Sequence, residues 1–481
     1  MKRLSILAIV GFLCMIFSLS VIPPMLVSLI YDDGELLHFV ISFVLIHVTG
    51  LLLWLPTRKA ATDFQRREGF IIVTLFWVVL SVMSAIPFMI GPHLSFVDAL
   101  FEAVSGFTTT GATVIIGLDT LPPSVLYYRG QLQWLGGMGL IVLAVAIMPM
   151  LGIGGMQLYK AEAPGPMKEE KIKPRLAETA RSLWVLYVGL TGACALGYWL
   201  TGMSPFDAIV HSFTTVSTGG FSTHDASLGY FDSVPIDLIA ILFMLAGGLN
   251  FALHYRAVIG LSLRPYWQDP EARTFLTFIV AAIVLIASTL WWFGEYQQLH
   301  EAISNSVFEV VSVITSTGFG TADFSSWPSF LPVTLIFISF IGGCGGSTAG
   351  GMKVSRVLLM FKQGAQEINF LIHPRSVRPL RIGKQVLSPR ISQAIWGFFS
   401  VYVLVFSLFT LLMMAAGLDQ VTAFSAVATC INNLGPGLGE VAVTFASVGT
   451  AAKLLGTLAM LLGRLEIFTI LVLLSPAFWR D

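Results

Sequence analysis

The chain has 481 residues, of which 56% are hydrophobic and only 11% are charged, and its formal net charge is zero. Soluble globular proteins carry about 25% charged residues, so this chain lacks the charge to cover a water-facing surface. Apolar runs of about 20 residues, the length that crosses a bilayer, recur along the whole chain. The composition therefore excludes a mainly soluble protein and indicates one that crosses a membrane many times.

The first two apolar runs predict a pair of transmembrane helices, at about 6–30 and 36–55, joined by the polar stretch YDDGE. A basic start followed by an apolar run is also typical of a signal peptide. This run is too long for one, however, and no A-x-A cleavage site follows it. We therefore expect residues 1–60 to form a retained N-terminal helix pair.

From residue 61 onward one pattern recurs: an apolar helix, a short segment ending in a glycine motif, and a second apolar helix. Each short segment opens with an acidic residue, which complements the positive end of a helix dipole, and is too short to span a bilayer. The sequence thus predicts four re-entrant segments. Their acidic residues are Asp98, Asp207, Glu301 and Asp419, and their motifs are TTTGATV, VSTGGFS, TSTGFGT and NNLGPGL. The long helices are expected at 70–90 and 129–151, 182–200 and 236–261, 275–293 and 331–360, and 391–416 and 451–478.

Two landmarks recur in phase. The central glycines of the motifs, taken as Gly111, Gly219, Gly318 and Gly435, lie 108, 99 and 117 residues apart, and a second glycine cluster follows each by 24–28 residues. In-phase recurrence indicates an internal repeat. The predicted fold is an all-α membrane protein with four helix–pore loop–helix repeats around one pore, at 61–160, 161–268, 269–372 and 373–481.

The basic residues indicate the orientation. Lys and Arg gather at the N-terminus and between the repeats, whereas the motif side carries only Arg129 and Lys453. The positive-inside rule then places the basic side and both termini in the cytoplasm, with ten spanning helices. The motif side is rich in acidic residues, either because an acidic outer face attracts cations or because acidic residues are merely tolerated there.

The glycine motifs suggest an ion path. Irregular backbone at membrane depth is tolerated where it lines a watery cavity, and carbonyl oxygens can replace the water shell of a cation. Carbonyls line a narrow path when ordinary and left-handed residues alternate, a conformation that glycine adopts cheaply. We expect the four loops to converge at the central glycines and at the residues before them, Thr110, Thr218, Thr317 and Leu434.

As a set, the four motifs resemble the filter loops of the Trk/Ktr/HKT potassium transporters, and the TrkH-type bacterial subunit in particular, over essentially the whole chain. The resemblance implies K⁺ as the transported ion, bound by these eight residues, in the bacterial inner (plasma) membrane. A serine at the first glycine accompanies sodium transport in plant relatives, so Gly111 favours potassium. Only the central glycine recurs in all four loops, which predicts weaker rejection of sodium than in a T-V-G-Y-G channel.

The stretch GGCGGSTAGGMK, at 342–353, should interrupt the second helix of the third repeat. A nucleotide-binding P-loop is excluded because Met352 follows Gly351 and Val354 follows Lys353. The stretch resembles the intramembrane loop that gates the pore in this family. The gate residues so implied are Gly345, Gly346, Ser347, Thr348, Ala349, Gly350 and Gly351.

Arg464 takes the place of a glycine found in the other repeats at Gly137, Gly248 and Gly343. A charged side chain at a helix centre costs about 2.5–3.5 kcal/mol on insertion scales, so it needs a partner or an aqueous cavity. One hypothesis makes Arg464 part of the gate, an electrostatic barrier under the filter. The other places it in a buried ion pair with an acid such as Glu466 or Glu309.

The resemblance also implies two protein partners: a TrkA-type cytosolic nucleotide-binding regulatory subunit and a second copy of this chain. Basic loops such as KEEKIKPR and HPRSVRPLRIGK offer docking surfaces, although ordinary positive-inside signals explain them equally well. A helix at 341–360 and the repeats before it offer a dimer interface. An alternative mechanism is an H⁺- or Na⁺-coupled symporter working by alternating access, although such folds usually contain two repeats. The sequence shows no nucleophile–base set, metal cluster, covalent cofactor motif or nucleic-acid signal, and we expect its four cysteines and the isolated His211, His254 and His300 to be structural.

Overall fold

The computed structural model describes residues 3–59, 66–142, 172–328, 330–374, 380–383, 385–386 and 389–479. These ranges are mostly helical, and the two-residue strands β1 (Arg381–Ile382) and β2 (Gln385–Val386) pair antiparallel. Six of the described helices are long and apolar enough to cross a membrane, and two bent pairs raise the number to eight. Two further helices, α7 (Pro123–Val142) and the ten-residue α17 (Phe330–Ser339), fall outside this set. The fold is therefore that of a multi-pass membrane protein, although not all ten expected spans appear as long apolar helices.

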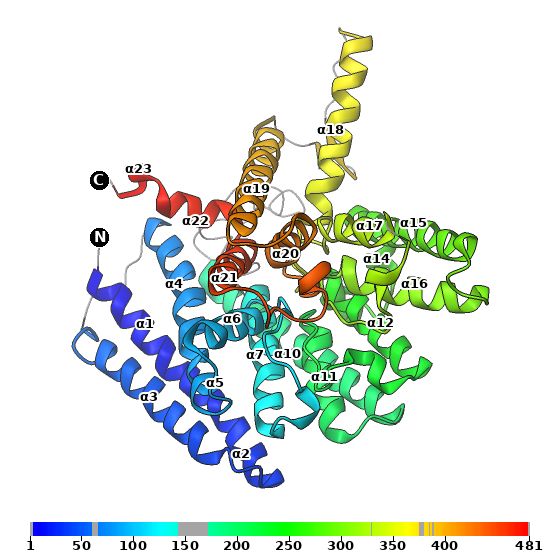
Figure 1. The fold of residues 1–481 in the computed structure, drawn as a ribbon. Helices are drawn as coiled ribbons and strands as arrows, with labels where there is room; N and C mark the ends of the chain where they lie inside the picture. Colours follow the sequence, from blue (N-terminus) through cyan, green and yellow to red (C-terminus); the bar gives the residue numbers. More distant parts are fainter. Residues whose placement is uncertain are drawn as a thin grey trace.

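The N-terminal helix pair is present at the edge of the molecule (Figure 1). Its first member combines α1 (Arg3–Ser18) and α2 (Ile22–Tyr31), which a 3₁₀ turn just before two prolines joins into one span of 28 residues. The second member, α3 (Leu36–Trp54), packs closely on α1. A Cβ atom added to Gly11 or Gly50 would lie 2.7 Å from the carbonyl oxygen of the other glycine, so the two backbones touch in the way that small residues permit in membranes.

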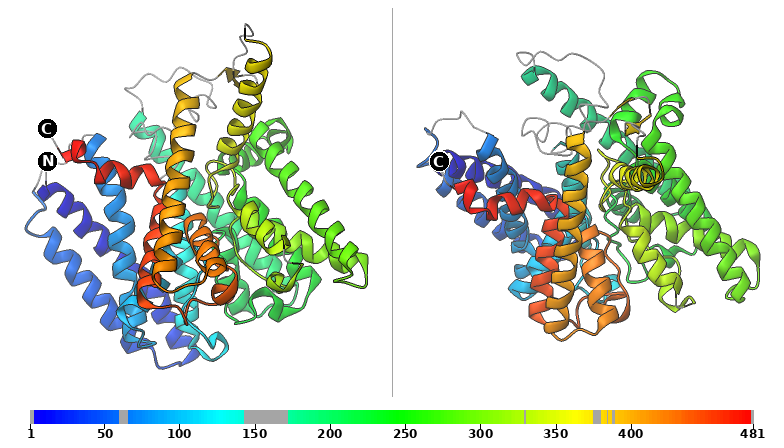
Figure 2. Two further views of the ribbon diagram at one scale, coloured as in Figure 1. Left: turned by 45° about the horizontal axis from the view of Figure 1, so that its top comes forward. Right: turned by 90° about the horizontal axis from the view of Figure 1, so that it is seen from above.

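Four repeats follow one another around the centre of the molecule, as the colours of Figure 1 show. The first contains α4 (Arg66–Ser84), α5 (Ile86–Ile90), α6 (Phe96–Phe107) and α7, and the second α10 (Ile172–Leu200), α11 (Pro205–Val216), α12 (Val234–Gly248), α13 (Phe251–Ile259) and α14 (Arg264–Gln268). The third contains α15 (Pro270–Phe293), α16 (Leu299–Ile314), α17 and α18 (Val354–Ile372), and the fourth α19 (Pro389–Ala415), α20 (Gln420–Asn432), α21 (Thr450–Arg464), α22 (Ile467–Leu474) and α23 (Pro476–Trp479). Parts of α18 and α19 extend beyond the remaining helices on one side (Figure 2).

The pore helices α6, α11, α16 and α20 have 12–16 residues. At 1.5 Å per residue they reach about 18–24 Å, less than the roughly 30 Å of a bilayer core, which agrees with the predicted re-entrant segments. Ser95 and Ser204 cap α6 and α11 by accepting the N–H groups of Asp98 and Asp207. Asp419 is itself the cap of α20 rather than a residue of its first turn.

The second helix is interrupted at the same place in three repeats. The chain bends by 103° after Gly248 and by 106° after Arg464, and an irregular segment at 340–353 separates α17 from α18. The sequence predicted only the last of these, so the unbroken helices expected at 236–261 and 451–478 are wrong. The cause is local: Asn250 caps a new helix by accepting the Ala252 N–H, and Glu466 has a left-handed φ of 53°. In the first repeat the predicted helix end at 143–151 lies outside the described residues.

The contact between Gly11 and Gly50 makes a stability prediction. Replacing Gly50 with Ala forces α1 and α3 apart, and overpacking of this kind costs roughly 1–3 kcal/mol. The control is Gly189→Ala in α10, where a Cβ has nothing within 4 Å. We expect thermal unfolding in detergent to begin at a lower temperature for Gly50→Ala and to be unchanged or slightly raised for Gly189→Ala. Equal melting of both variants would contradict close packing of the pair.

Candidate ion pathway

The four glycine loops meet in a closed ring. A Cβ atom added to the left-handed glycine of each loop would lie within 3 Å of a carbonyl oxygen of the next loop. Gly111 faces the carbonyl of Gly219, Gly220 that of Thr317, Gly318 that of Leu434, and Gly435 that of Thr110. Each repeat therefore borders the next, the fourth borders the first, and a side chain at these positions has no room.

The backbone alternation expected from the sequence is present in all four loops. Two residues with positive φ flank one ordinary residue, and the first of them has φ of 51–53° although it is not glycine. Such residues cost about 1–3 kcal/mol each, so the surrounding structure must hold them in place. It does so alike in each loop: the N–H of the intervening residue donates over 2.8 Å to the carbonyl five residues earlier. The left-handed pairs are Thr109 and Gly111, Thr218 and Gly220, Ser316 and Gly318, and Asn433 and Gly435.

The second loop differs by one residue from the predicted alignment. The counterpart of Gly111 is Gly220, not Gly219, and Gly219 corresponds to Thr110. The caps Ser95 and Ser204 of two equally long pore helices lie 109 residues apart, as do Gly111 and Gly220. The motif STGG offers two adjacent glycines, and the pattern of motifs alone did not separate them. Thr218 accordingly takes the place of Thr109.

A polar side chain behind each loop fastens it to its own pore helix. Glu102 accepts the Val114 N–H at 3.0 Å, and Glu309 accepts those of Thr321 and Ala322 at 3.0 and 3.2 Å. His211 Nε2 lies 3.0 Å from Ser222 Oγ, and Ser425 Oγ accepts the Leu438 N–H at 2.9 Å. Sequence reasoning missed this role of the two carboxylates, although Glu102 and Glu309 both lie nine residues before a loop glycine within apolar sequence.

A buried ion pair joins the first two loops. Arg129 Nε donates to Glu102 Oε1 over 2.9 Å, and the two side chains are 1% and 0% exposed. The same guanidinium donates to the Ser222 carbonyl over 3.1 Å and lies 4.2 Å from the centre of the Phe221 ring. Arg129, one of two basic residues on the motif side, is therefore a bridge between repeats.

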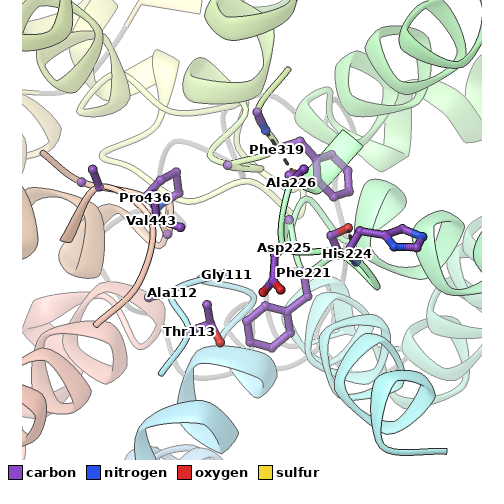
Figure 3. A pocket seen from close by; sticks show the side chains of 18 of the residues that line it. Gly111, Ala112, Thr113, Phe221, His224, Asp225, Ala226, Phe319, Pro436 and Val443 are labelled. Atoms are coloured by element: carbon purple, nitrogen blue, oxygen red, sulfur yellow. Dashed lines mark hydrogen bonds between the residues drawn. The ribbon is translucent and has the colours of Figure 1, made fainter. Parts of the chain in front are cut away.

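A cavity of about 370 Å³ opens above the ring and is lined by all four loops. Figure 3 shows Gly111, Phe221, Phe319 and Pro436 around a common centre. Asp225 and Asp323 are among its lining residues. Near its rim the hydrogen bond from His224 lowers the pKa of Asp119 from its usual 3.8, so this group carries negative charge at neutral pH. The acidic rim attracts cations to the mouth.

The predicted gate loop lies against the other side of the ring. The N–H of Gly350 donates to Ser316 Oγ over 2.5 Å, and that of Gly351 to the Asn432 carbonyl over 3.1 Å. Thr348 Oγ1 accepts from Thr218 Oγ1 over 3.2 Å. Three of the four glycine loops therefore contact the segment directly. Its remaining predicted residues lie in the same loop, where the Gly345 N–H donates to Glu271 over 2.8 Å and the Gly346 carbonyl accepts the Phe251 N–H.

Arg464 is 3% exposed and reaches the same segment, where its Nη1 donates to the Thr348 carbonyl over 3.1 Å. Within the described part of the chain neither proposed acid pairs with it. Glu466 instead accepts from Arg356 at 2.8 Å, and Glu309 holds the third loop. An ion pair of Arg464 with either of these two acids is therefore wrong. The expected structural histidines His211 and His254 are buried with both ring nitrogens in hydrogen-bonding contact.

This architecture, with four re-entrant loops around one axis in a multi-pass helical protein, defines a pore-type membrane transport protein. The chain belongs to the TrkH family of cation transport proteins, whose family model matches residues 36–480. It is 51% identical to the Trk system potassium uptake protein TrkH of Vibrio parahaemolyticus over 100% of both chains, and 51% identical to that of Escherichia coli K12 over 99% of both. The crystal structure of the potassium transporter TrkH from Vibrio parahaemolyticus matches with a TM-score of 0.93 and 49% identity over 100% of both chains.

The Glu102–Arg129 pair should be sensitive to losing one partner. Replacing Glu102 with Gln leaves a buried guanidinium without its counter-charge, which costs about 3–5 kcal/mol. The double variant Glu102→Gln/Arg129→Met should recover part of this loss, because no buried charge remains. As a control, Lys453→Met breaks the Asp98–Lys453 pair, which joins the first and fourth repeats but leaves an Asp98 side chain that is 28% exposed. Melting temperatures in detergent, measured by size exclusion, should rank Glu102→Gln lowest.

Proposed function

We propose that this chain carries K⁺ through the central ring and across the bacterial inner membrane. The observation that carries the proposal is the closed ring of four loops, in which alternating left-handed residues leave carbonyl oxygens in successive layers around one axis. The pore helices end at this ring, and the negative end of each helix dipole favours a cation there. The relatives are named as potassium uptake proteins, which supports K⁺ as the transported ion.

The proposed K⁺ ligands are backbone carbonyls of the predicted filter residues in the corrected register. One layer is formed by Thr110, Gly219, Thr317 and Leu434, and the next by Gly111, Gly220, Gly318 and Gly435, with Thr218 one layer below. The first layer contains three kinds of residue, two threonines, a glycine and a leucine. Such unequal surroundings favour a site that is less uniform, and less strict towards sodium, than four identical loops would form.

The proposed gate is the segment 345–351 together with Arg464. The segment lies directly against the ring, and the guanidinium adds a positive charge beside the Thr348 carbonyl. A cation leaving the ring on this side meets both a steric and an electrostatic obstacle. Opening requires the segment to move, and its many glycines and the interrupted helix around it make such a movement feasible.

The positive-inside pattern supports cytoplasmic termini and an inward-facing gate. A TrkA-type regulatory subunit on this side, and a homodimer of the chain, are proposed from the family resemblance. Exposed apolar side chains on α18, at Phe361, Ile368 and Leu371, offer contact area for a protein partner. The region 341–360 suggested for the dimer is a loop up to Lys353 and a helix only from Val354. The first half of the basic stretch KEEKIKPR, at 168–171, lies outside the described residues, and its second half begins α10.

Ion flux through proteoliposomes at a set voltage tests the proposed function. We expect uptake of K⁺ and Rb⁺ above Na⁺ and Li⁺ without any proton or sodium gradient. Replacing Gly318 with Ser should reduce K⁺ flux at least tenfold, because φ is +81° and the added atoms collide with the Leu434 carbonyl. Gly320→Ala is the matched control, since a Cβ there meets only an ordinary contact at 3.9 Å. Obligatory coupling to H⁺ or Na⁺, or full K⁺ selectivity in Gly318→Ser, would refute the proposal.

Arg464 provides a separate test of the gate. Truncation to Ala removes the guanidinium and its hydrogen bond to the Thr348 carbonyl, so basal K⁺ flux without a regulatory partner should rise several-fold. Arg356→Ala serves as the control, because this arginine pairs with Glu466 at the bend between α21 and α22 and not with residues 345–351. A basal flux that is unchanged in Arg464→Ala would remove Arg464 from the gate.

A further inference from the structure

We propose that Gln133, in α7 of the first repeat, helps to set the preference for K⁺ over Na⁺ by holding the carbonyl of Gly219 in the second loop. The inference rests on the proposed function, because it concerns the same ring. It concerns a positioning residue that lies behind the ion path and acts through the backbone it holds.

The amide of Gln133 is fully buried and bonded at both ends. Its Nε2 donates to the Gly219 carbonyl over 2.6 Å, and its Oε1 accepts the Phe221 N–H over 3.0 Å. The amide can satisfy both partners in only one orientation, since one partner is an acceptor and the other a donor. The two bonds bracket Gly220, the left-handed glycine of this loop, so Gln133 fixes the loop on both sides of its most unusual residue.

Gln133 occupies the space of a missing side chain. Gly219 stands where the other loops have Thr110, Thr317 and Leu434, and a Cβ added to Gly219 would collide with the Gln133 amide. In the first and third loops the threonine hydroxyl at this place bonds over 2.7 Å to the threonine two residues earlier. The second loop cannot form that bond. The glutamine of the neighbouring repeat supplies both the volume and the polar contact.

The carbonyl oxygen of Gly219, to which Gln133 donates, lies at the ring itself. The Gly219 carbonyl oxygen is the nearest atom to the position that a Cβ of Gly111 would take. Preference between two alkali cations depends on the spacing of the coordinating carbonyls and on the field that they present. A carbonyl tied from behind cannot move inward onto a smaller ion as freely. One of its lone pairs is also engaged by an N–H group, which weakens the field it presents to an ion.

Comparison of the four repeats suggests a substitution of similar size for Gln133. Gln133 lies four residues before Gly137, and the residues four before Gly248, Gly343 and Arg464 are Met244, Ser339 and Met460. Methionine has nearly the length of glutamine and already occupies this place in two repeats. Gln133→Met therefore keeps the volume behind Gly219 and removes only the hydrogen bonds.

Gln131 gives a matched control on the same helix. Its Nε2 donates over 2.8 Å to the Ser20 carbonyl of the N-terminal helix pair, away from the ring. In proteoliposomes we expect Gln133→Met to lower the K⁺/Na⁺ flux ratio about fivefold, the factor that a hydrogen bond of about 1 kcal/mol corresponds to. Gln131→Met should keep the ratio of the unaltered protein.

The outcomes separate this inference from the function on which it rests. A Gln133→Met ratio equal to that of the unaltered protein overturns the role of Gln133 and leaves the K⁺ pathway standing. An equal fall in Gln131→Met also overturns it, because general loosening of α7 would then explain the result. If the unaltered protein shows no K⁺-selective flux, the proposed function itself is refuted.

A rescue experiment examines the missing side chain. Gly219→Thr alone should lose most flux, because the threonine collides with Gln133. The double variant Gln133→Ala/Gly219→Thr gives the second loop the arrangement of the first and third, with Ser217 in the place of Thr108 and Thr315. We expect its K⁺/Na⁺ ratio to exceed that of Gln133→Ala alone. A double variant with no higher ratio than Gln133→Ala would contradict the replacement of a side chain by the Gln133 amide.

Discussion

The architecture depends on one steric constraint: four chain segments must bring their carbonyl oxygens to one axis at backbone distance from each other. Each left-handed glycine lies so close to a carbonyl of the next loop that a Cβ has no place. A non-glycine residue held at positive φ accompanies each glycine, and such a conformation lasts only if the surroundings over-determine it. The short pore helices, the carboxylates behind the loops and the Arg129 bridge all serve to hold this backbone.

The four repeats solve the same problem with different side chains. Behind the loops stand a glutamate paired with arginine, a histidine, a glutamate without a basic partner among the described residues, and a serine. The second helices differ too: two bend sharply, and one opens into the segment that lies under the ring. The four repeats thus share the backbone geometry of the loops, while each repeat uses different side chains to support it.

Much of the fold could be predicted from the sequence because membrane constraints leave strong patterns. Apolar run length indicated the spans, and phased glycines indicated four repeats and their meeting point. The features that the sequence did not predict depend on single local contacts, which leave no periodic pattern in the sequence. The choice between Gly219 and Gly220 depends on helix caps that lie 109 residues apart. The helix breaks after Gly248 and Arg464 depend on single residues, Asn250 and Glu466. Gln133 acts on a loop of another repeat, which its own neighbours in the sequence do not reveal. The roles of the ring and the gate segment remain proposals.

A ring formed by a single chain has a genetic consequence. In a pore assembled from four identical subunits, every change of one codon appears four times around the axis. Here one change alters one quadrant and leaves three intact. Under the proposed function, preference among ions can therefore change in small steps, because each quadrant can diverge while the other three keep their geometry.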